Sequence, residues 1–252
     1  MKRSFKVLFA LLCIAHSAIF AQSSAFGIKG GLTIGQQNWN NNGTSDNSLL
    51  FKYHGAAFVE TVPSTPTSAI LFAQLGYHTR GSAFRYRAAT VNIGGTQTNV
   101  GGFTQEFVFN NVALQVGFKK RNVLGSEQAY YAVGFRAEYT VSNSLSDLNS
   151  TSYFYSTFPT KDYVQKFNYG LSLAGGYEFP FSELASGFVE LSIHPDISKQ
   201  YFQPAIAVNY RDPYSGTVIT SLHEQSIRNI TFELSVGFRF LRKVVYVDGS
   251  FQ

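Results

Sequence analysis

The sequence contains one cysteine and few charged residues. Cys13 lies near the amino terminus, so the chain that follows it has no disulfide, no thiol nucleophile and no thiolate metal ligand. Charged residues make up 14% of the chain, against about a quarter in a typical soluble domain. These absences exclude a disulfide-stabilised scaffold and a cysteine-dependent enzyme.

Long apolar runs are also missing after the first 20 residues. Lys2, Arg3 and Lys6 precede an apolar stretch at 7–20, which is typical of a secretory signal peptide cleaved before Gln22. Cys13 lies inside that stretch, too early to be a lipoprotein cysteine. No later segment approaches the roughly 18 apolar residues of a spanning helix. If the chain crosses a membrane, it does so with strands.

Excess charge of one sign is absent from the predicted mature chain. Removing Lys2, Arg3 and Lys6 from the 20 Lys and Arg leaves 17, against 15 Asp and Glu, a formal charge of only +2. This balance predicts no nucleic-acid partner. The histidines after the signal peptide are scattered singly, so we expect no metal site, and no motif indicates a cofactor.

Strict alternation of apolar and polar residues is what the sequence has instead. Between residues 230 and 240, every second residue is apolar and those between are small or polar, which places the two sets on opposite faces of one strand. Eight such segments occur, at about residues 26–36, 49–60, 69–87, 107–119, 129–141, 167–179, 187–194 and 230–240. Short connectors at 61–68, 120–128 and 180–186 alternate with longer, polar ones at 38–48, 88–102, 142–162 and 195–228.

Two architectures fit this alternation. A soluble periplasmic lipid-binding barrel would bury its apolar face, whereas a transmembrane barrel turns that face to lipid. The interior of eight strands is just filled by side chains, so several Phe and Tyr per strand would be crowded inside. We therefore predict an all-β, eight-stranded antiparallel up-and-down transmembrane β-barrel in the bacterial outer membrane. The predicted divisions are a signal peptide (1–21), a monomeric barrel contacting membrane lipid (22–241) and a short periplasmic extension (242–252).

The barrel interpretation places charged residues inside the lumen, where they must pair to offset their desolvation. We expect a plug with no catalytic residue; the alternative is a narrow, gated ion path. Glu233 is predicted to pair with an arginine. The predicted lumen charge network comprises Lys29, Lys52, Glu60, Arg136, Glu138, Glu178, Glu190, Glu233 and Arg239.

A second function class rests on Glu190, Ser192 and His194, which share one strand face. An acid, a hydroxyl and an imidazole are the components of a hydrolase, here one that would modify lipid. Residues two apart on a strand are about 6–7 Å apart, however, which predicts that Ser192 and His194 do not contact each other. A row of lumen-facing polar residues explains the pattern as well.

The long connectors are the remaining functional surface. Residues 201–222 resemble two strands around a turn at 212–216. Exposed aromatic residues are typical of sites that bind a protein partner. The third long connector is rich in them, and its predicted partner-docking residues are Tyr153, Phe154, Tyr155 and Phe158.

The chain resembles the PorT-like outer-membrane β-barrel proteins of the Bacteroidetes. The resemblance is carried by IFAQ at 19–22, FGIKGGLTIG at 26–35 and FELSVGFRF at 232–240, and it covers essentially the mature chain. It implies an eight-stranded barrel with both ends in the periplasm, and for some relatives a link to type IX secretion. Unlike barrels that end at the aromatic residue of the last strand, this chain continues after Phe240, so either Phe240 or Phe251 would be the assembly signal.

Overall fold

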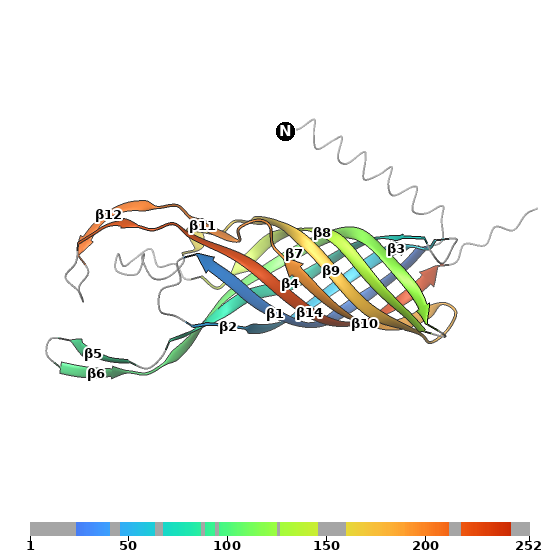
Figure 1. Cartoon of the computed structure of the whole chain (residues 1–252), viewed down its shortest axis with the longest axis horizontal. Coiled ribbons are helices and arrows are strands. Elements are labelled where there is room, and N and C mark those ends of the chain that lie inside the picture. Colours follow the sequence, from blue (N-terminus) through green and yellow to red (C-terminus); the bar gives the residue numbers. More distant parts are fainter. Residues whose placement is uncertain are drawn as a thin grey trace, which may run out of the picture.

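Eight long antiparallel strands form the body of the protein in the computed structural model, which describes residues 24–40, 46–63, 68–86, 89–93, 96–124, 127–145, 160–211 and 218–242 (Figure 1). These strands are β1 (Ser24–Asn40), β3 (Leu50–Thr61), β4 (Ile70–Tyr86), β7 (Phe103–Leu124), β8 (Glu127–Asn143), β9 (Phe167–Pro180), β10 (Ala185–Pro195) and β14 (Gln225–Arg242). Each pairs with its neighbour in chain order. The predicted up-and-down fold is confirmed.

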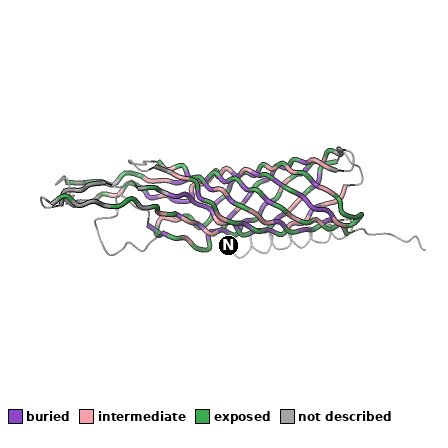
Figure 2. The backbone as a smooth tube through the Cα atoms, turned by 90° about the horizontal axis from the view of Figure 1, so that it is seen from below, coloured by how far each residue is buried: buried purple, intermediate pink, exposed green. Residues whose placement is uncertain are grey.

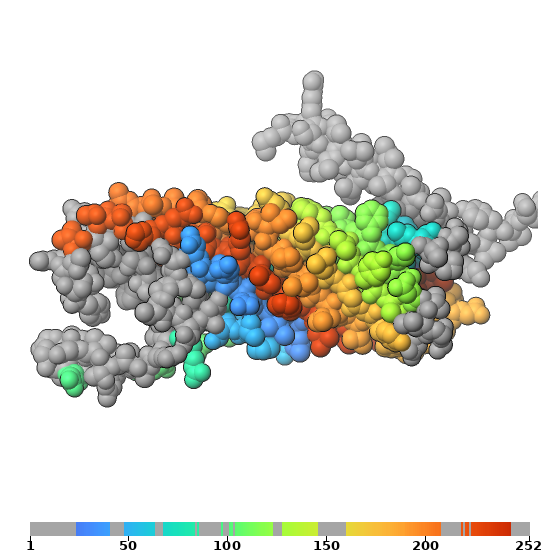
Figure 3. All heavy atoms as spheres, in the orientation of Figure 1, coloured from blue at the N-terminus to red at the C-terminus, as the bar shows by residue number. Residues whose placement is uncertain are grey.

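The ring closes between the first and last strands. β1 pairs with β14 over the full length of β1, from Ser24 opposite Arg242 to Asn40 opposite Ser226. In Figure 3 the blue atoms of β1 lie against the red-orange atoms of β14. The start of β1 and the end of β14 therefore lie at the same end of the barrel. We name it the turn end because the short connectors lie there. The opposite side is the loop end.

Buried and exposed residues alternate along the strands, as the alternating sequence predicts (Figure 2). On β14, Thr231, Glu233 and Ser235 are fully buried, whereas Leu234 and Val236 between them are 47% and 61% exposed. The large outward side chains of all eight strands are exposed in the same way. The alternative of a soluble barrel with an apolar interior is therefore wrong, since the apolar residues cover the outside and polar ones fill the inside.

Four large aromatic side chains also point inward, in the half of the barrel nearest the turn end. Each lies opposite a glycine on a neighbouring strand: Phe58 opposite Gly27, Phe72 opposite Gly117, Tyr130 opposite Gly176 and Phe188 opposite Gly237. A Cβ atom on Gly237 would lie 2.4 Å from the Phe188 ring, and one on Gly176 would lie 2.4 Å from the Tyr130 ring. The glycines thus provide the space that the rings occupy.

At the loop end the strands enclose a small apolar core. Phe107, Phe109, Leu145, Tyr201 and Ile227 are buried together there, and Trp39 packs against them with its ring centroid 5.2 Å from that of Phe107. β2 (Asp46–Ser48), β11 (Tyr201–Gln203) and the 3-10 helix η1 (Lys161–Tyr163) surround this end. We name this group the apolar cap.

Two hairpins extend from the loop end (Figure 1). The predicted hairpin is present as β12 (Ile206–Arg211) paired with β13 (Val218–Leu222). A second hairpin, β5 (Ala89–Ile93) with β6 (Thr96–Val100), was not predicted. The residues that the structure describes include no helix with the length and apolar character needed to cross a membrane.

The predicted signal peptide, the docking residues Tyr153, Phe154, Tyr155 and Phe158, and Phe251 lie outside the described residues.

Candidate functional site: the charged lumen

Buried charges are arranged in layers along the barrel axis. The layer nearest the turn end contains two carboxylates and three cations. Glu60 contacts Arg121 and Arg239 through short ion pairs, and its Oε2 atom lies 3.3 Å from the ammonium of Lys119. Glu178 contacts Arg121 at 3.1 Å and Arg239 at 3.3 Å. We name these five residues the turn-end cluster.

The next layer is a single buried ion pair. The ammonium of Lys29 contacts the carboxylate of Glu190, which also accepts a hydrogen bond of 2.8 Å from the hydroxyl of Tyr130. Lys29 comes from β1 and Glu190 from β10, the two strands that flank β14, so this pair connects them across the inner face of β14.

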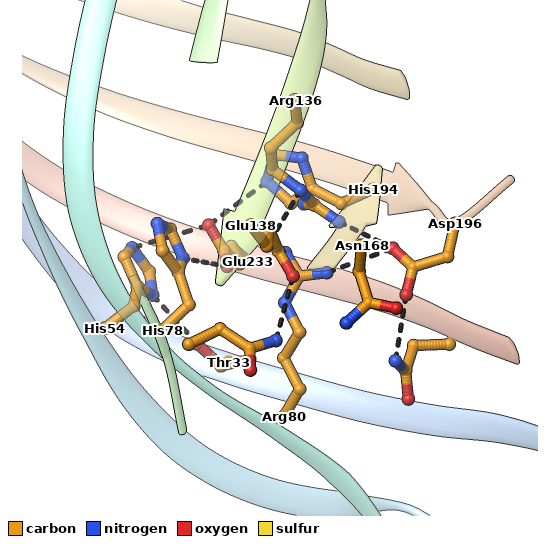
Figure 4. Close-up of polar contacts among 12 residues, drawn as sticks. Thr33, His54, His78, Arg80, Arg136, Glu138, Asn168, His194, Asp196 and Glu233 are labelled. Atoms are coloured by element: carbon orange, nitrogen blue, oxygen red, sulfur yellow. Dashed lines mark hydrogen bonds and ion pairs between the residues drawn. The ribbon is translucent and has the colours of Figure 1, made fainter. Parts of the chain in front are cut away.

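Glu233 occupies the middle of the lumen among three histidines (Figure 4). Its carboxylate oxygens lie 2.7 Å from Nδ1 of His78, 3.1 Å from Nε2 of His194 and 3.9 Å from Nε2 of His54. The rings of His54 and His78 are stacked, with centroids 5.5 Å apart. The predicted arginine partner of Glu233 is wrong: among the described residues its ion-pair partners are imidazoles, because the arginines of β4 and β8 lie one layer closer to the loop end.

That next layer is a quartet of two arginines and two carboxylates, all almost fully buried. Glu138 Oε1 forms ion pairs with Arg136, whose Nε lies 2.7 Å away, and with Arg80, whose Nη2 lies 2.9 Å away. Asp196 accepts from Arg136 at 2.9 Å and from Arg80 at 3.2 Å. Asn111 adds a hydrogen bond of 2.9 Å to Glu138. We name Arg80, Arg136, Glu138 and Asp196 the arginine quartet (Figure 4).

Neutral polar groups connect the quartet to the apolar cap. Asn229 donates to Asp196 at 2.8 Å and accepts from Gln37 at 2.9 Å, and Gln200 donates to Thr140 at 2.8 Å. The cap then covers this layer from the loop end. Along its length the described lumen is thus occupied by ion pairs, amides, hydroxyls and finally apolar side chains.

The charges of these layers balance as a whole but not layer by layer. The described lumen holds six carboxylates (Glu60, Glu138, Glu178, Glu190, Asp196 and Glu233) and six cations (Lys29, Arg80, Lys119, Arg121, Arg136 and Arg239). The turn-end cluster has three cations and two carboxylates, a net +1. Counting Asp, Glu, Lys and Arg alone, the layer of Glu233 has a net −1. The other two layers are neutral.

The hydrolase hypothesis meets a different geometry from the one expected. The Ser192 hydroxyl lies 2.9 Å from Nε2 of His194, so the prediction that these side chains do not meet is wrong; they lean toward each other along the strand. The same Nε2 atom also contacts Glu233, whereas Nδ1 of His194 has no hydrogen-bond partner among the described residues. A nucleophile–base–acid relay needs both ring nitrogens, one for each partner. Glu190 is occupied by Lys29 and Tyr130 instead.

Most of the predicted network lies in these layers, with one exception. Lys52 contacts Glu106 at 2.7 Å near the loop end, where both side chains are partly exposed. The network omitted Arg80, Lys119, Arg121 and Asp196. The first three occupy the inward phase of their strands, so alternation could have added them. Asp196 follows the last residue of β10 and has no periodic signal. No group of His, Asp or Glu in the described part of the chain has the arrangement of a metal site.

Comparison with known proteins gives the family. Residues 20–195 match the family model described as "Outer membrane protein beta-barrel domain". Among solved structures, OprG of Pseudomonas aeruginosa is 10% identical, with a TM-score of 0.49, and the match covers 87% of this chain and 97% of that one. Neisserial surface protein A is 10% identical, with a TM-score of 0.38 and coverages of 86% and 97%. The outer membrane protease OmpT of Escherichia coli is 12% identical, with a TM-score of 0.38 and coverages of 87% and 97%. No match was found among curated proteins.

Proposed function

Since the chain belongs to the family of outer-membrane β-barrel domains and is located in the bacterial outer membrane, we propose that it is a monomeric, non-enzymatic barrel with a plugged lumen. Its role is structural or partner-docking: the lipid-embedded wall anchors a loop end that binds a protein partner. The turn end faces the periplasm, because short turns lie on that side in outer-membrane barrels.

The observation that carries the plug is the occupation of the lumen by mutually paired charges. The arginine quartet and the Lys29–Glu190 pair consist of side chains that are 10% exposed or less. Moving a solute past them requires separating buried ion pairs, each of which costs about 3–5 kcal/mol when one partner is lost. The apolar cap adds a second obstacle at the loop end.

Single-channel recording in planar bilayers tests this proposal. Purified wild-type protein is expected to give no steady conductance. The variant Lys199→Ser with Glu224→Ser removes an exposed ion pair at 3.1 Å and leaves the lumen layers unchanged, so it should give no steady conductance either. Large steady conductance of the wild-type barrel would overturn the plug.

Partner docking at the loop end is supported by the two hairpins and by the aromatic residues predicted at 153–158. Strands β12 and β13 pair only with each other among the described strands, as do β5 and β6, so their outer edges are available to a partner strand. Affinity capture from detergent-solubilised outer membrane should recover a partner with the wild-type chain and lose it when residues 146–159 are deleted. Glu183→Ala, in an exposed short connector at the turn end, is the control. Equal recovery with all three chains would refute docking through 146–159.

The resemblance to PorT-like proteins of the Bacteroidetes supports a narrower assignment, as an accessory of type IX secretion. A strain lacking this chain is then expected to lose type IX export, and the wild-type gene should restore it. Unchanged export in the deletion strain would limit the role to anchoring. Amino-terminal sequencing of the mature protein tests cleavage before Gln22.

A further inference from the structure

A small cavity inside the barrel lies between the turn-end cluster and the Lys29–Glu190 pair. Its volume is about 30 Å³. Its wall includes the four inward aromatic rings, Phe58, Phe72, Tyr130 and Phe188, each of which lies opposite a glycine. We name it the lumen chamber. A water molecule needs about 10–15 Å³ of such space, so the chamber has room for one or two particles of that size.

Two amides face the chamber without a partner. Gln74 of β4 and Gln115 of β7 lie opposite each other in register and both line the cavity. They are only 5% and 4% exposed, and neither side chain makes a hydrogen bond to any described residue. Polar groups in a protein interior nearly always find a partner in the protein or in a bound molecule, and these amides open onto the chamber. These two amides indicate that the chamber holds a ligand that accepts or donates hydrogen bonds.

The charges around the chamber decide the sign of that ligand. Lys29 and Glu190 cancel, but the turn-end cluster carries one cation more than it has carboxylates. The least tightly paired of these cations is Lys119: its ammonium lies 3.3 Å from Glu60 and 3.9 Å from Glu178, and it sits 3.9 Å from the centroid of the Tyr130 ring. Lys119 also lines the chamber. The wall itself holds two ammonium groups and two carboxylates, since Glu60 and Glu190 also line the chamber. The excess cation lies in the turn-end cluster behind this wall, and an anion in the chamber would compensate it.

We propose that the lumen chamber binds one small inorganic anion, of which chloride has the appropriate size and charge. The ammonium of Lys119 and the NH₂ groups of Gln74 and Gln115 are its donors. The anion compensates the excess positive charge of the turn-end cluster from inside the barrel. It lies between that cluster and the Lys29–Glu190 pair, so the ion pairs of the cluster stay in place. This proposal is independent of partner docking and of the absence of conductance.

Chloride titration of thermal unfolding tests the site in the purified barrel. Sodium chloride is exchanged for sodium gluconate at constant sodium concentration, so that general screening is held fixed. A ligand that binds the folded state at about a hundred times its Kd should raise the midpoint by about 5 °C or more in a chain of this size. Equal midpoints in the two salts would overturn the proposal.

Three variants separate binding from a loss of packing. Gln74→Leu and Gln115→Leu keep the approximate volume but remove the donors, and each should flatten the chloride dependence. Gln200→Leu is the control: Gln200 is a buried amide near the loop end with hydrogen bonds of its own, so this variant should lose stability yet keep the chloride-dependent rise.

Crystals of the wild-type protein grown in bromide supply a readout that does not depend on any variant folding. An anomalous peak between Lys119 and the two glutamine amides is expected. Density for water in the chamber without an anomalous peak would show that the site takes a neutral ligand, and the proposal would then be wrong.

Discussion

Removing one carboxylate from the arginine quartet is expected to destabilise the barrel far more than removing a balanced pair. In Glu138→Leu, Arg80 and Arg136 share Asp196 as their single remaining carboxylate in the quartet, so one cation is left without compensation in a fully buried site. Losing one partner of a buried pair costs about 3–5 kcal/mol. The same quartet without Arg136 and Glu138 keeps one neutral pair, Arg80 with Asp196, at 3.2 Å.

The double variant Arg136→Met with Glu138→Leu should therefore recover most of that loss, because replacing a buried pair by apolar residues of similar volume is close to neutral. Asn111 loses its acceptor in both variants, so its cost of about 1–2 kcal/mol cancels in the comparison. The double variant should therefore be more stable than Glu138→Leu by about 3–5 kcal/mol.

Urea unfolding of the barrel in lipid vesicles measures these differences. Trp39 is the single tryptophan and packs in the apolar cap, so its fluorescence reports unfolding at the loop end. Equal destabilisation by the single and the double variants would refute the argument, because it would mean that the quartet contributes through side-chain volume and not through charge balance.

Three further predictions concern the lumen, the lipid face and the strand backbone. Glu233→Gln should cost only about 1–2 kcal/mol in the same assay, because its partners are imidazoles; a loss as large as that of Glu138→Leu would indicate a fully charged partner. Leu234→Arg places a cation on the outer face of β14 and should cost about 2–4 kcal/mol in vesicles, and a neutral effect would contradict the lipid contact of that face. Gly81 has φ of 151°, and a Cβ there would lie 1.8 Å from the Phe107 carbonyl oxygen. Gly81→Val should therefore cost about 2 kcal/mol or more, and the backbone amides of β4 and β7 should exchange with solvent faster than in the wild type.

The sequence was sufficient to predict the eight strands and their inward faces, because lipid on one side and polar contacts on the other impose a period of two. The predicted strands are too short at their ends. β7 was expected at 107–119 and extends over Phe103–Leu124. At both ends of β7, around polar residues such as Gln105 and Lys120, apolar and polar residues no longer alternate in the sequence, so the signal disappears before the strand ends.

The partners within the lumen were less predictable than the lumen itself. Each histidine of the Glu233 layer occupies the polar phase of its own strand, which was visible in the sequence. Which of them share a height depends on the stagger between strands, and Glu233 on β14 and His78 on β4 lie on strands that are not neighbours in the ring. Alternation along one strand contains no information on that stagger, which is why an arginine was expected where His78 lies.

The balance of charge within the lumen bears on where recognition takes place. Six carboxylates and six cations compensate one another over the described lumen. A charged side chain that already has an ion-pair partner gains little free energy by leaving it to bind a solute. The lumen chamber is the exception, and its volume of about 30 Å³ admits only a particle of atomic size. The outer wall is apolar and contacts lipid. Among the described residues, the two hairpins extend from the barrel at the loop end, where we propose partner docking.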